Sequence, residues 1–251
     1  MTLEAGELRV ENLRGGYAGT VVLEGVSFRI GAGGKLGILG RNGVGKTTMF
    51  ACIMGLAQIH GGRITFGGTD VTALPTWRRA RAGLGYVPQT RDIFKSLSVE
   101  ENLFSAVRSA ADDKRVEAAF ALFPRLRERR NNNGTQLSGG EQQMLAVARA
   151  TISGPTLLLM DEPLEGLAPR LRDELMDAIR NMVETSGIGC LLVEQHVDVV
   201  LDFADEVLIL ERGKPVYVGG VDELREDPSI LDHAIGLRKG TREGSSIARA
   251  W

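Results

Sequence analysis

Short apolar runs typical of strands alternate along the chain with segments of helical periodicity. These two patterns predict the secondary-structure elements. Three strands separated by glycine-rich turns are predicted near the N-terminus, at residues 7–13, 20–30 and 35–40. Continuous apolar runs, typical of parallel strands buried on both faces, follow in the second half at residues 156–161, 189–194 and 206–210. Segments 169–185 and 196–203 lie between these runs and have helical periodicity. The pattern predicts an α/β core that begins with antiparallel strands.

The middle of the chain is mainly helical in its pattern. A helix is predicted over 49–57, followed by a short strand over 62–66. From 76 to 153 the helical pattern dominates, and one apolar strand at 84–88 interrupts it. We therefore expect a helical insertion, at about 90–153, within the α/β core.

Composition narrows the class of protein. The 251 residues are 43% hydrophobic and 25% charged, which is ordinary for a soluble globular protein. A net charge of −2 gives no global basic field, so nucleic acid is not an expected partner. No apolar run approaches the roughly 18 residues that a membrane span needs. We therefore expect any contact with a membrane to pass through another protein.

The segment GRNGVGKTT comes directly after a predicted strand and before a predicted helix. It matches the phosphate-binding pattern G-x-x-x-x-G-K-[ST], in which backbone amides turn inward around phosphate oxygens. Lys46 can bridge the β- and γ-phosphates, and the Thr47 hydroxyl can coordinate Mg²⁺. The sequence predicts a site for ATP and Mg²⁺. The candidate nucleotide-binding residues are Gly40, Arg41, Asn42, Gly43, Val44, Gly45, Lys46, Thr47 and Thr48.

Two carboxylates lie at the end of the apolar run 156–161, of which Asp161 is the last residue and Glu162 the next one. Asp161 is placed to hold Mg²⁺, directly or through water, and the neighbouring Glu162 is suited to polarise an attacking water. An apolar strand with a polar end is a common structural feature by itself. Together with the phosphate-binding segment it favours ATP hydrolysis, with Glu162 as a catalytic residue and Asp161 as a metal ligand.

A second candidate anion site lies at Leu137–Gln143, with the sequence LSGGEQQ. Ser138 and Glu141 have the spacing of a capping box, which places Ser138 and the Gly139 and Gly140 amides at a helix N-terminus. Such an end binds an anion. Because the chain already has one phosphate loop, Ser138, Gly139, Gly140 and Glu141 are expected to bind ATP held between two subunits.

LSGGEQQ, between the phosphate loop and the Asp161 strand, resembles the signature of ATP-binding-cassette (ABC) ATPases. The resemblance covers residues 8–237. It implies a P-loop ABC ATPase core with an N-terminal antiparallel β subdomain and a helical subdomain at about 90–153. The nucleotide-binding domain would span 1–237, and the polar segment 238–251 would form a mobile tail.

The resemblance assigns roles to further residues. Tyr17 matches the aromatic residue that stacks on adenine. Gln89, in GYVPQT, matches the glutamine that contacts Mg²⁺ and the attacking water and that senses the membrane partner. In this family a switch residue, commonly histidine, contacts the γ-phosphate. A gapless alignment with other cassettes places this position at Gln195, and His196 then occupies a helix-capping or surface position. The alternative register, with His196 as the switch residue, is shifted by one.

Within this family the chain most resembles the smaller ATPase of branched-chain (hydrophobic) amino acid uptake systems and its urea and amide relatives. The matching stretches are GRNGVGKTT, RAGLGYVPQTRDIFKSLSVEENL, LFPRLRERR, LSGGEQQMLAVARA, DEPLEGLAP and LLVEQ. Two positions depart from many other cassettes. Ala168 stands where an aspartate often crosses the dimer interface, and Leu164 stands where a small hydroxyl residue is common.

The resemblance implies the ATP-hydrolysing subunit of an ABC importer of branched-chain amino acids or small amides. Its partners would be integral membrane permease subunits, a second copy or a second ABC ATPase, and an extracytoplasmic substrate-binding protein. The chain would lie at the cytoplasmic face of the membrane, and the region Gln89 to Phe104 would receive a short helix of the permease. Two other interpretations are a soluble ABC ATPase that acts on a non-membrane scaffold and a nucleotide sensor without turnover.

Overall fold

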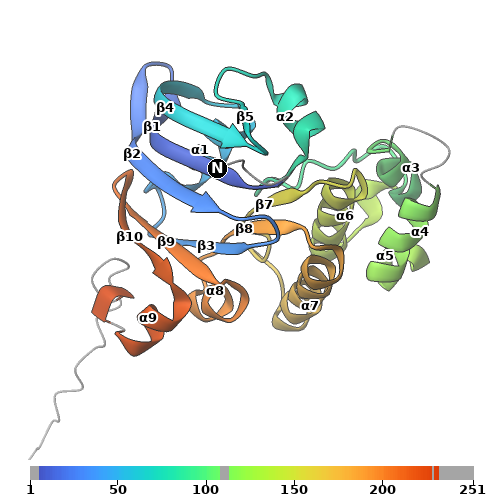
Figure 1. Cartoon of the computed structure of the whole chain (residues 1–251). Helices are drawn as coiled ribbons and strands as arrows, with labels where there is room; N and C mark the ends of the chain where they lie inside the picture. Colours follow the sequence, from blue (N-terminus) through green and yellow to red (C-terminus); the bar gives the residue numbers. More distant parts are fainter. Residues whose placement is uncertain (1–5, 108–112, 228, 232–251) are drawn as a thin grey trace, which may run out of the picture.

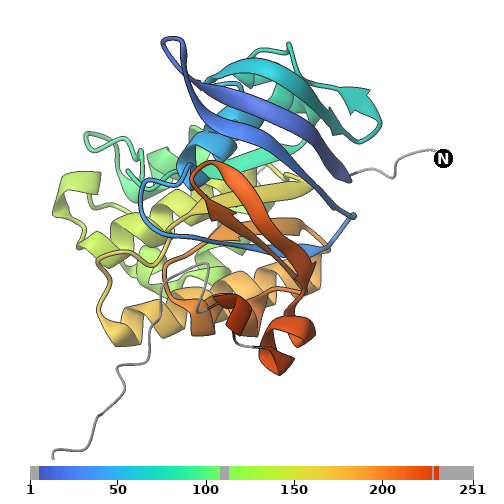
Figure 2. The same cartoon turned by 90° about the vertical axis from the view of Figure 1, so that its left-hand side faces the viewer.

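The computed structural model describes residues 6–107, 113–227 and 229–231. The predicted tail, 238–251, lies outside these residues. Two β-sheets are stacked one above the other, and helices cover the lower sheet (Figures 1 and 2). The described residues therefore confirm the α/β fold class.

The upper sheet is antiparallel and has the strand order β2-β1-β4-β5. Its strands are β1 (Leu8–Tyr17), β2 (Thr20–Ile30), β4 (Gln58–Phe66) and β5 (Thr69–Asp70). The lower sheet has the order β10-β9-β3-β8-β7-β6 and is parallel except for β10. Its strands are β3 (Lys35–Leu39), β6 (Leu84–Val87), β7 (Leu157–Asp161), β8 (Gly189–Val193), β9 (Glu206–Glu211) and β10 (Lys214–Gly220).

The helices form three groups. Between the sheets lies α1 (Lys46–Met54), with α2 (Thr76–Ala82) beside it. The middle of the chain supplies α3 (Val99–Phe104), α4 (Asp113–Leu122), α5 (Pro124–Glu128) and α6 (Gly139–Ile152). The last group consists of α7 (Pro169–Ser186), α8 (Val197–Phe203) and α9 (Val221–Glu226). In Figure 1, α3, α4 and α5 project beyond α6, away from the stacked sheets.

Several predicted elements differ from the observed ones. The helix predicted at 49–57 begins at Lys46 instead and ends where Gly55 adopts a left-handed conformation with φ 74°. The predicted long helical region is broken by loops before α3 and before α6. The strand β10 and the helix α9 were not predicted, because their sequences are short and partly polar.

The core has separate layers that follow from this arrangement. Apolar side chains of α1 fill the space between the two sheets, and α6 and α7 cover the opposite face of the parallel sheet. A smaller cluster packs α8 and α9 against β3 and β9. At Gly37 of β3, a Cβ atom would lie only 2.2 Å from Cγ1 of Val200, so glycine is needed for the close approach of α8.

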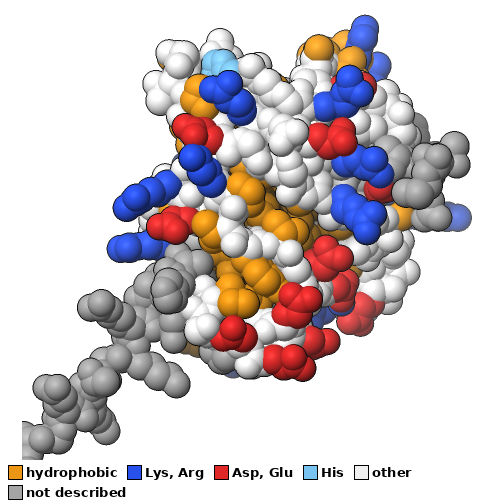
Figure 3. All heavy atoms as spheres, turned by 60° about the vertical axis from the view of Figure 1, so that its left-hand side comes forward, with side chains coloured by type: hydrophobic (Ala, Val, Ile, Leu, Met, Phe, Trp, Pro, Cys, Tyr) orange, Lys and Arg blue, Asp and Glu red, His pale blue; other side chains and the backbone are white. Residues whose placement is uncertain are grey.

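One face of the molecule is shown in Figure 3. Apolar side chains gather at its centre, with most basic side chains above them and most acidic side chains below. In the part of the chain that the structure describes, no helix is both long enough and apolar enough to span a membrane.

Candidate nucleotide-binding site

The candidate residues meet at the carboxyl ends of three neighbouring strands. The phosphate-binding segment follows β3, Asp161 ends β7, and Gln195 comes two residues after β8. Because β3, β8 and β7 are parallel neighbours, these ends lie at one edge of the sheet. A cavity of about 300 Å³ opens there. Residues that line it include Asn42, Lys46, Thr47, Gln89, Glu162 and Gln195.

The phosphate-binding segment forms a tight loop that leads into α1. Gly45 occupies the N-cap position with φ 110°, and a Cβ atom there would lie 2.8 Å from Cδ2 of Leu23. Lys46 is 5% exposed, and its Nζ donates to the carbonyl oxygens of Gly40 at 2.8 Å and Arg41 at 3.2 Å. Burial lowers the pKa of Lys46, although Glu162 opposes this shift. The loop therefore holds its cation at the N-terminus of a helix, where phosphate groups bind.

Asp161 is fully buried, and neither of its carboxylate oxygens makes a well-formed hydrogen bond with any described residue. Burial raises its pKa to about 6, although the hydroxyls of Thr47 and Tyr86 are close enough to oppose the shift. A buried carboxylate without a hydrogen-bond partner is costly unless a cation or water satisfies it. Asp161 and Thr47 supply the oxygen ligands that Mg²⁺ prefers, so the residues fit this ion.

Glu162 follows Asp161 and has an unusual backbone conformation, with φ 50°. Its amide donates to the carbonyl oxygen of Val193 at 2.9 Å, which holds the turn against β8. The side chain is 8% exposed, and its Oε1 lies 3.9 Å from Nζ of Lys46. Its Oε2 accepts a hydrogen bond from Nε2 of Gln195 at 2.6 Å. The strained turn thus aims the carboxylate into the cavity.

The structure places Gln195, and not His196, at the cavity. Gln195 lines it, whereas His196 is exposed and is the N-cap residue of α8, with no hydrogen bond from its side chain to that helix. Neighbouring residues at a strand end point in different directions, which explains why only one of the two enters the cavity.

Gln89 lies on the other side of the cavity. Its Nε2 donates to Oε2 of Glu165 at 2.6 Å. Glu165 belongs to the loop that follows Glu162, and both Gln89 and Glu165 line the cavity. Tyr17 ends β1, is 47% exposed and is not among the residues that line the cavity.

Glu194 is a residue of the site that sequence reasoning missed. It is 2% exposed, and its carboxylate accepts hydrogen bonds from the amide of Leu164 at 2.8 Å and from the amide of Gln195 at 3.3 Å. Burial raises its pKa to about 7. The signal in the sequence was an acidic residue at the end of an apolar run. Glu194 joins the loop after Glu162 to the backbone of Gln195.

The two positions that depart from many cassettes are explained in part. Leu164 is fully buried in the apolar cluster beneath α6 and α7, which accounts for a large apolar side chain there. Ala168 is the N-cap residue of α7 and supplies no side-chain hydrogen bond. Pro169, at the first position of the helix, suits that start because its missing N–H would be unpaired in any case.

The second candidate anion site lies apart from this cavity. Ser138 is the N-cap residue of α6, and its Oγ accepts from the amide of Glu141 at 3.3 Å. Oε2 of Glu141 accepts from the amide of Ser138 at 2.7 Å, which completes the predicted capping box. None of the segment from Ser138 to Glu141 lines the cavity. The two groups of residues predicted to bind phosphate therefore lie at separate places on the chain.

Comparison with known proteins gives a consistent result. A family described as ABC transporter matches residues 23–165. LivF of Archaeoglobus fulgidus, described as a probable branched-chain amino acid transport ATP-binding protein, is 35% identical over 92% of this chain and 99% of its own length. BraG of Pseudomonas aeruginosa, a high-affinity branched-chain amino acid transport ATP-binding protein, is 35% identical over 88% of this chain and 95% of its own. LptB of Escherichia coli K12, a lipopolysaccharide export system ATP-binding protein, is 32% identical over 89% of this chain and 94% of its own length.

Solved structures show the same architecture. An ATP-binding subunit of an ABC transporter superimposes with a TM-score of 0.79 at 29% identity, covering 90% of this chain and 97% of its own. An ABC transporter cassette in its ADP conformation gives a TM-score of 0.75 at 26% identity, with coverage of 90% and 97%. These matches confirm the predicted P-loop core, antiparallel β subdomain and helical subdomain.

Proposed function

This chain belongs to the ABC transporter family, and from that premise we propose that it powers the import of branched-chain amino acids or related small amides. It is an ATPase and the ATP-binding subunit of a transporter. The direction of transport, the substrate and the residue roles given below are parts of the proposal.

One observation supports the catalytic part most strongly. Lys46, Thr47, Glu162 and Gln195 line a single cavity, and the buried carboxylate of Asp161 lies beside Thr47 without a hydrogen-bond partner of its own among the described residues. These are the groups that phosphoryl transfer needs, because its catalysis consists mainly of positioning and charge stabilisation. Thr47, Asp161 and Gln89 would hold Mg²⁺, which neutralises charge on the phosphates when bound.

The protein's own groups divide the remaining tasks. Lys46 binds phosphate oxygens through its ammonium group, which donates to the loop carbonyl oxygens of Gly40 and Arg41 in this structure. Glu162 orients the attacking water and accepts its proton, since its carboxylate points into the cavity. Gln195 holds Glu162 with one N–H and has a second N–H for a γ-phosphate oxygen. Tyr17 would stack on adenine from outside the described cavity.

The position of the second anion site supports a dimer. Ser138 and the amides of Gly139 and Gly140 lie outside the cavity of their own chain, so they would complete the site of another subunit. A head-to-tail pair then contains two ATP molecules, each between the phosphate loop of one chain and the signature of the other. The second chain is a copy of this one or a related ABC ATPase.

The permease would dock beside Gln89. A hollow of about 630 Å³ lies there, and Gln89 and Glu165 line both this hollow and the nucleotide cavity. A permease helix in this hollow would therefore contact the same residue that touches the nucleotide. The chain would lie against the cytoplasmic face of the membrane through this contact, and an extracytoplasmic binding protein would deliver the substrate.

The substrate class rests on relatives. LivF and BraG are named for branched-chain amino acid transport, and they are 35% identical to this chain. LptB, at 32% identity, is named for lipopolysaccharide export, so export is the competing direction. The matching stretches quoted above, from the phosphate loop to LLVEQ, favour the import group.

The test is transport in the assembled system. The chain is co-expressed with candidate permease and binding-protein genes from the same genome, and uptake of labelled leucine, valine and urea into vesicles is measured with ATP inside. ATP-dependent uptake is expected, and Lys46→Ala should abolish both uptake and ATPase activity. ATP-dependent extrusion of a lipid would instead support the exporter. Co-purification with a soluble scaffold and no membrane protein would support the non-membrane alternative.

A further inference from the structure

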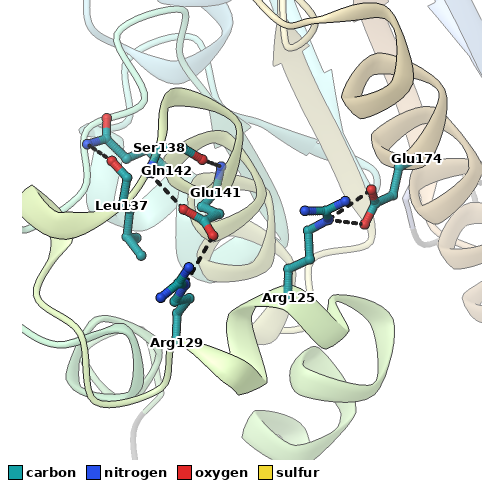
Figure 4. Close-up of polar contacts among 7 residues, drawn as sticks. All are labelled: Arg125, Arg129, Leu137, Ser138, Glu141, Gln142 and Glu174. Carbon is teal, nitrogen blue, oxygen red and sulfur yellow. Dashed lines mark hydrogen bonds and ion pairs between the residues drawn. The ribbon is translucent and has the colours of Figure 1, made fainter.

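Two arginines next to the signature helix reach different carboxylates. Arg125 of α5 donates through Nε to both carboxylate oxygens of Glu174 on α7, at 2.9 and 3.0 Å. Arg129, the residue that follows α5, points to Glu141 in the first turn of α6, with its Nε 3.4 Å from Oε1 (Figure 4). The two side chains come from one short stretch, but only Arg129 reaches the signature.

The capping box leaves a defined set of donors at the start of α6. The amide of Ser138 is occupied by Oε2 of Glu141, and the amide of Glu141 is occupied by Oγ of Ser138 (Figure 4). The amides of Gly139 and Gly140 belong to the first turn of the helix and have no acceptor within it. These two N–H groups, with the Ser138 hydroxyl, are the donors that remain for a phosphate.

Glu141 creates a difficulty for such a site, because it is an acid in the turn that has to bind an anion. Burial raises its pKa, but hydrogen bonds from Ser138 and the charge of Arg129 outweigh that effect, and the net shift is downward. The side chain is therefore a carboxylate at neutral pH. A carboxylate is also a strong acceptor for helix N-terminal amides, so a displaced Glu141 would compete with phosphate for Gly139 and Gly140.

We propose that Arg129 is a positioning residue for ATP binding: it fixes Oε1 of Glu141 away from the Gly139 and Gly140 amides and keeps them available for the γ-phosphate of the opposite subunit. This inference rests on the proposed function, in which the signature closes over ATP. In the capping box, Oε2 is held by Ser138, and Arg129 is the group that occupies the other oxygen. The carboxylate is then bound at both oxygens, which disfavours its rotation toward the free amides.

Arg91 is the other arginine close to this helix end, and it has a different contact. Its Nη1 donates to Oε1 of Gln142 at 3.5 Å, and a Cβ atom on Gly139 would lie 3.1 Å from it. Arg91 thus contacts a neutral amide, whereas Arg129 contacts the carboxylate. The effect proposed here is therefore specific to the Arg129–Glu141 pair.

The test is a double-mutant cycle on the full-length chain, with ATPase rates measured over a range of ATP concentrations. Arg129→Gln should raise the KM for ATP about three- to fivefold and leave kcat unchanged, because Glu162 and Gln195 are untouched. Glu141→Gln keeps an acceptor for the capping box but removes the charge. In the Glu141→Gln background, Arg129→Gln should change KM less than about twofold. Arg125→Gln is the matched control, since it breaks a shorter ion pair that does not involve the signature.

The outcomes separate three possibilities. An Arg129→Gln effect that is equally large in both backgrounds would mean that Arg129 acts on the phosphate itself, and it would overturn the proposal. A comparable rise in KM for Arg125→Gln would also overturn it, because the cause would then be a general loosening of the helices. ATPase activity that survives Lys46→Ala would overturn the proposed function, and this inference with it.

Discussion

The side-chain amide of Gln195 donates to the Glu162 carboxylate over 2.6 Å, and both residues line the nucleotide cavity. Glutamine has two N–H groups on one nitrogen, so the contact with Glu162 leaves one for a phosphate oxygen. The amide does not titrate at neutral pH, unlike the histidine that commonly occupies this position. Gln195 can therefore connect Glu162 and the γ-phosphate in a single protonation state.

The roles of Gln195 and His196 can be separated by substitution. Gln195→Ala should remove both the hydrogen bond to Glu162 and the one proposed to the γ-phosphate. Loss of the second alone, on the order of 1.5–3 kcal/mol, should lower kcat/KM roughly tenfold to a hundredfold. His196→Ala should leave turnover nearly unchanged, because His196 does not line the cavity, and should cost little stability, because its side chain makes no capping hydrogen bond to α8. Steady-state ATPase assays of both variants in the assembled transporter measure this.

The wild-type pH profile provides a check on the same point. The pH dependence of the ATPase rate should be the same in His196→Ala as in the wild type, because the His196 side chain does not line the cavity. If His196→Ala lost activity while Gln195→Ala kept it, the histidine would be the switch residue, and the alignment of this segment would be shifted by one residue.

Much of the site was predictable from sequence, because its parts are local motifs at the carboxyl ends of parallel strands, and these ends lie at one edge of the sheet. GRNGVGKTT follows one apolar strand and Asp161 ends another, and neighbouring parallel strands bring such ends together. The capping box at Ser138 was also predictable, since its residues are only three apart.

Contacts between distant side chains were not predictable in this way. The pairs Gln195–Glu162 and Gln89–Glu165 depend on how loops meet at the sheet edge. Glu194 was missed because a buried acid at a strand end has no spacing pattern of its own. The edge strand β10 was missed because its two valines are exposed, and the half-buried positions beside them hold Pro215, Tyr217 and Gly219, which do not form an apolar alternation.

Replacing Glu162 by Gln tests the proposed general base. The substitution keeps the shape and an acceptor for Gln195, but it removes the carboxylate that polarises water. ATP binding should persist, and turnover should fall by about 10² or more. ATPase assays and nucleotide binding by isothermal titration measure the two effects. Full activity in Glu162→Gln would reduce Glu162 to a structural acid that pairs with Lys46.

Arg79 provides a prediction about stability. Its side chain is 2% exposed and donates to four backbone carbonyls, including those of Cys52 and Ile53 at the end of α1, at distances of 2.7 to 2.8 Å. Arg79→Met would remove the guanidinium donor from all four carbonyl oxygens, of which that of Cys52 keeps the amide of Gly55. The free energy of unfolding should therefore fall by about 3 kcal/mol. Denaturant titration followed by circular dichroism measures this.

Arg78 is the matched control for that experiment. It lies on the same helix, is exposed, and stacks over Trp77 at 5.1 Å. Arg78→Met should change the free energy of unfolding by less than about 1 kcal/mol. Equal losses for the two variants would mean that the carbonyl contacts of Arg79 contribute nothing specific.

Glu194 predicts a pH dependence of stability. Its pKa rises from 4.5 to about 7 on folding, because burial disfavours the charged form. The folded chain therefore binds this proton more tightly than the unfolded chain does. The resulting stabilisation is complete below pH 4.5 and is lost as the pH rises through about 7.

The corresponding experiment compares wild type with Glu194→Gln between pH 5 and pH 8. The wild-type free energy of unfolding should fall, relative to that of the variant, by on the order of 3 kcal/mol across this range, because the buried carboxyl must ionise. Asp161 titrates in both proteins and cancels in the difference. Glu184→Gln, on the exposed side of α7, is the matched control for the replacement of one carboxylate by an amide. A difference between wild type and Glu194→Gln that is flat with pH would show that Glu194 is already ionised in the folded chain at pH 5.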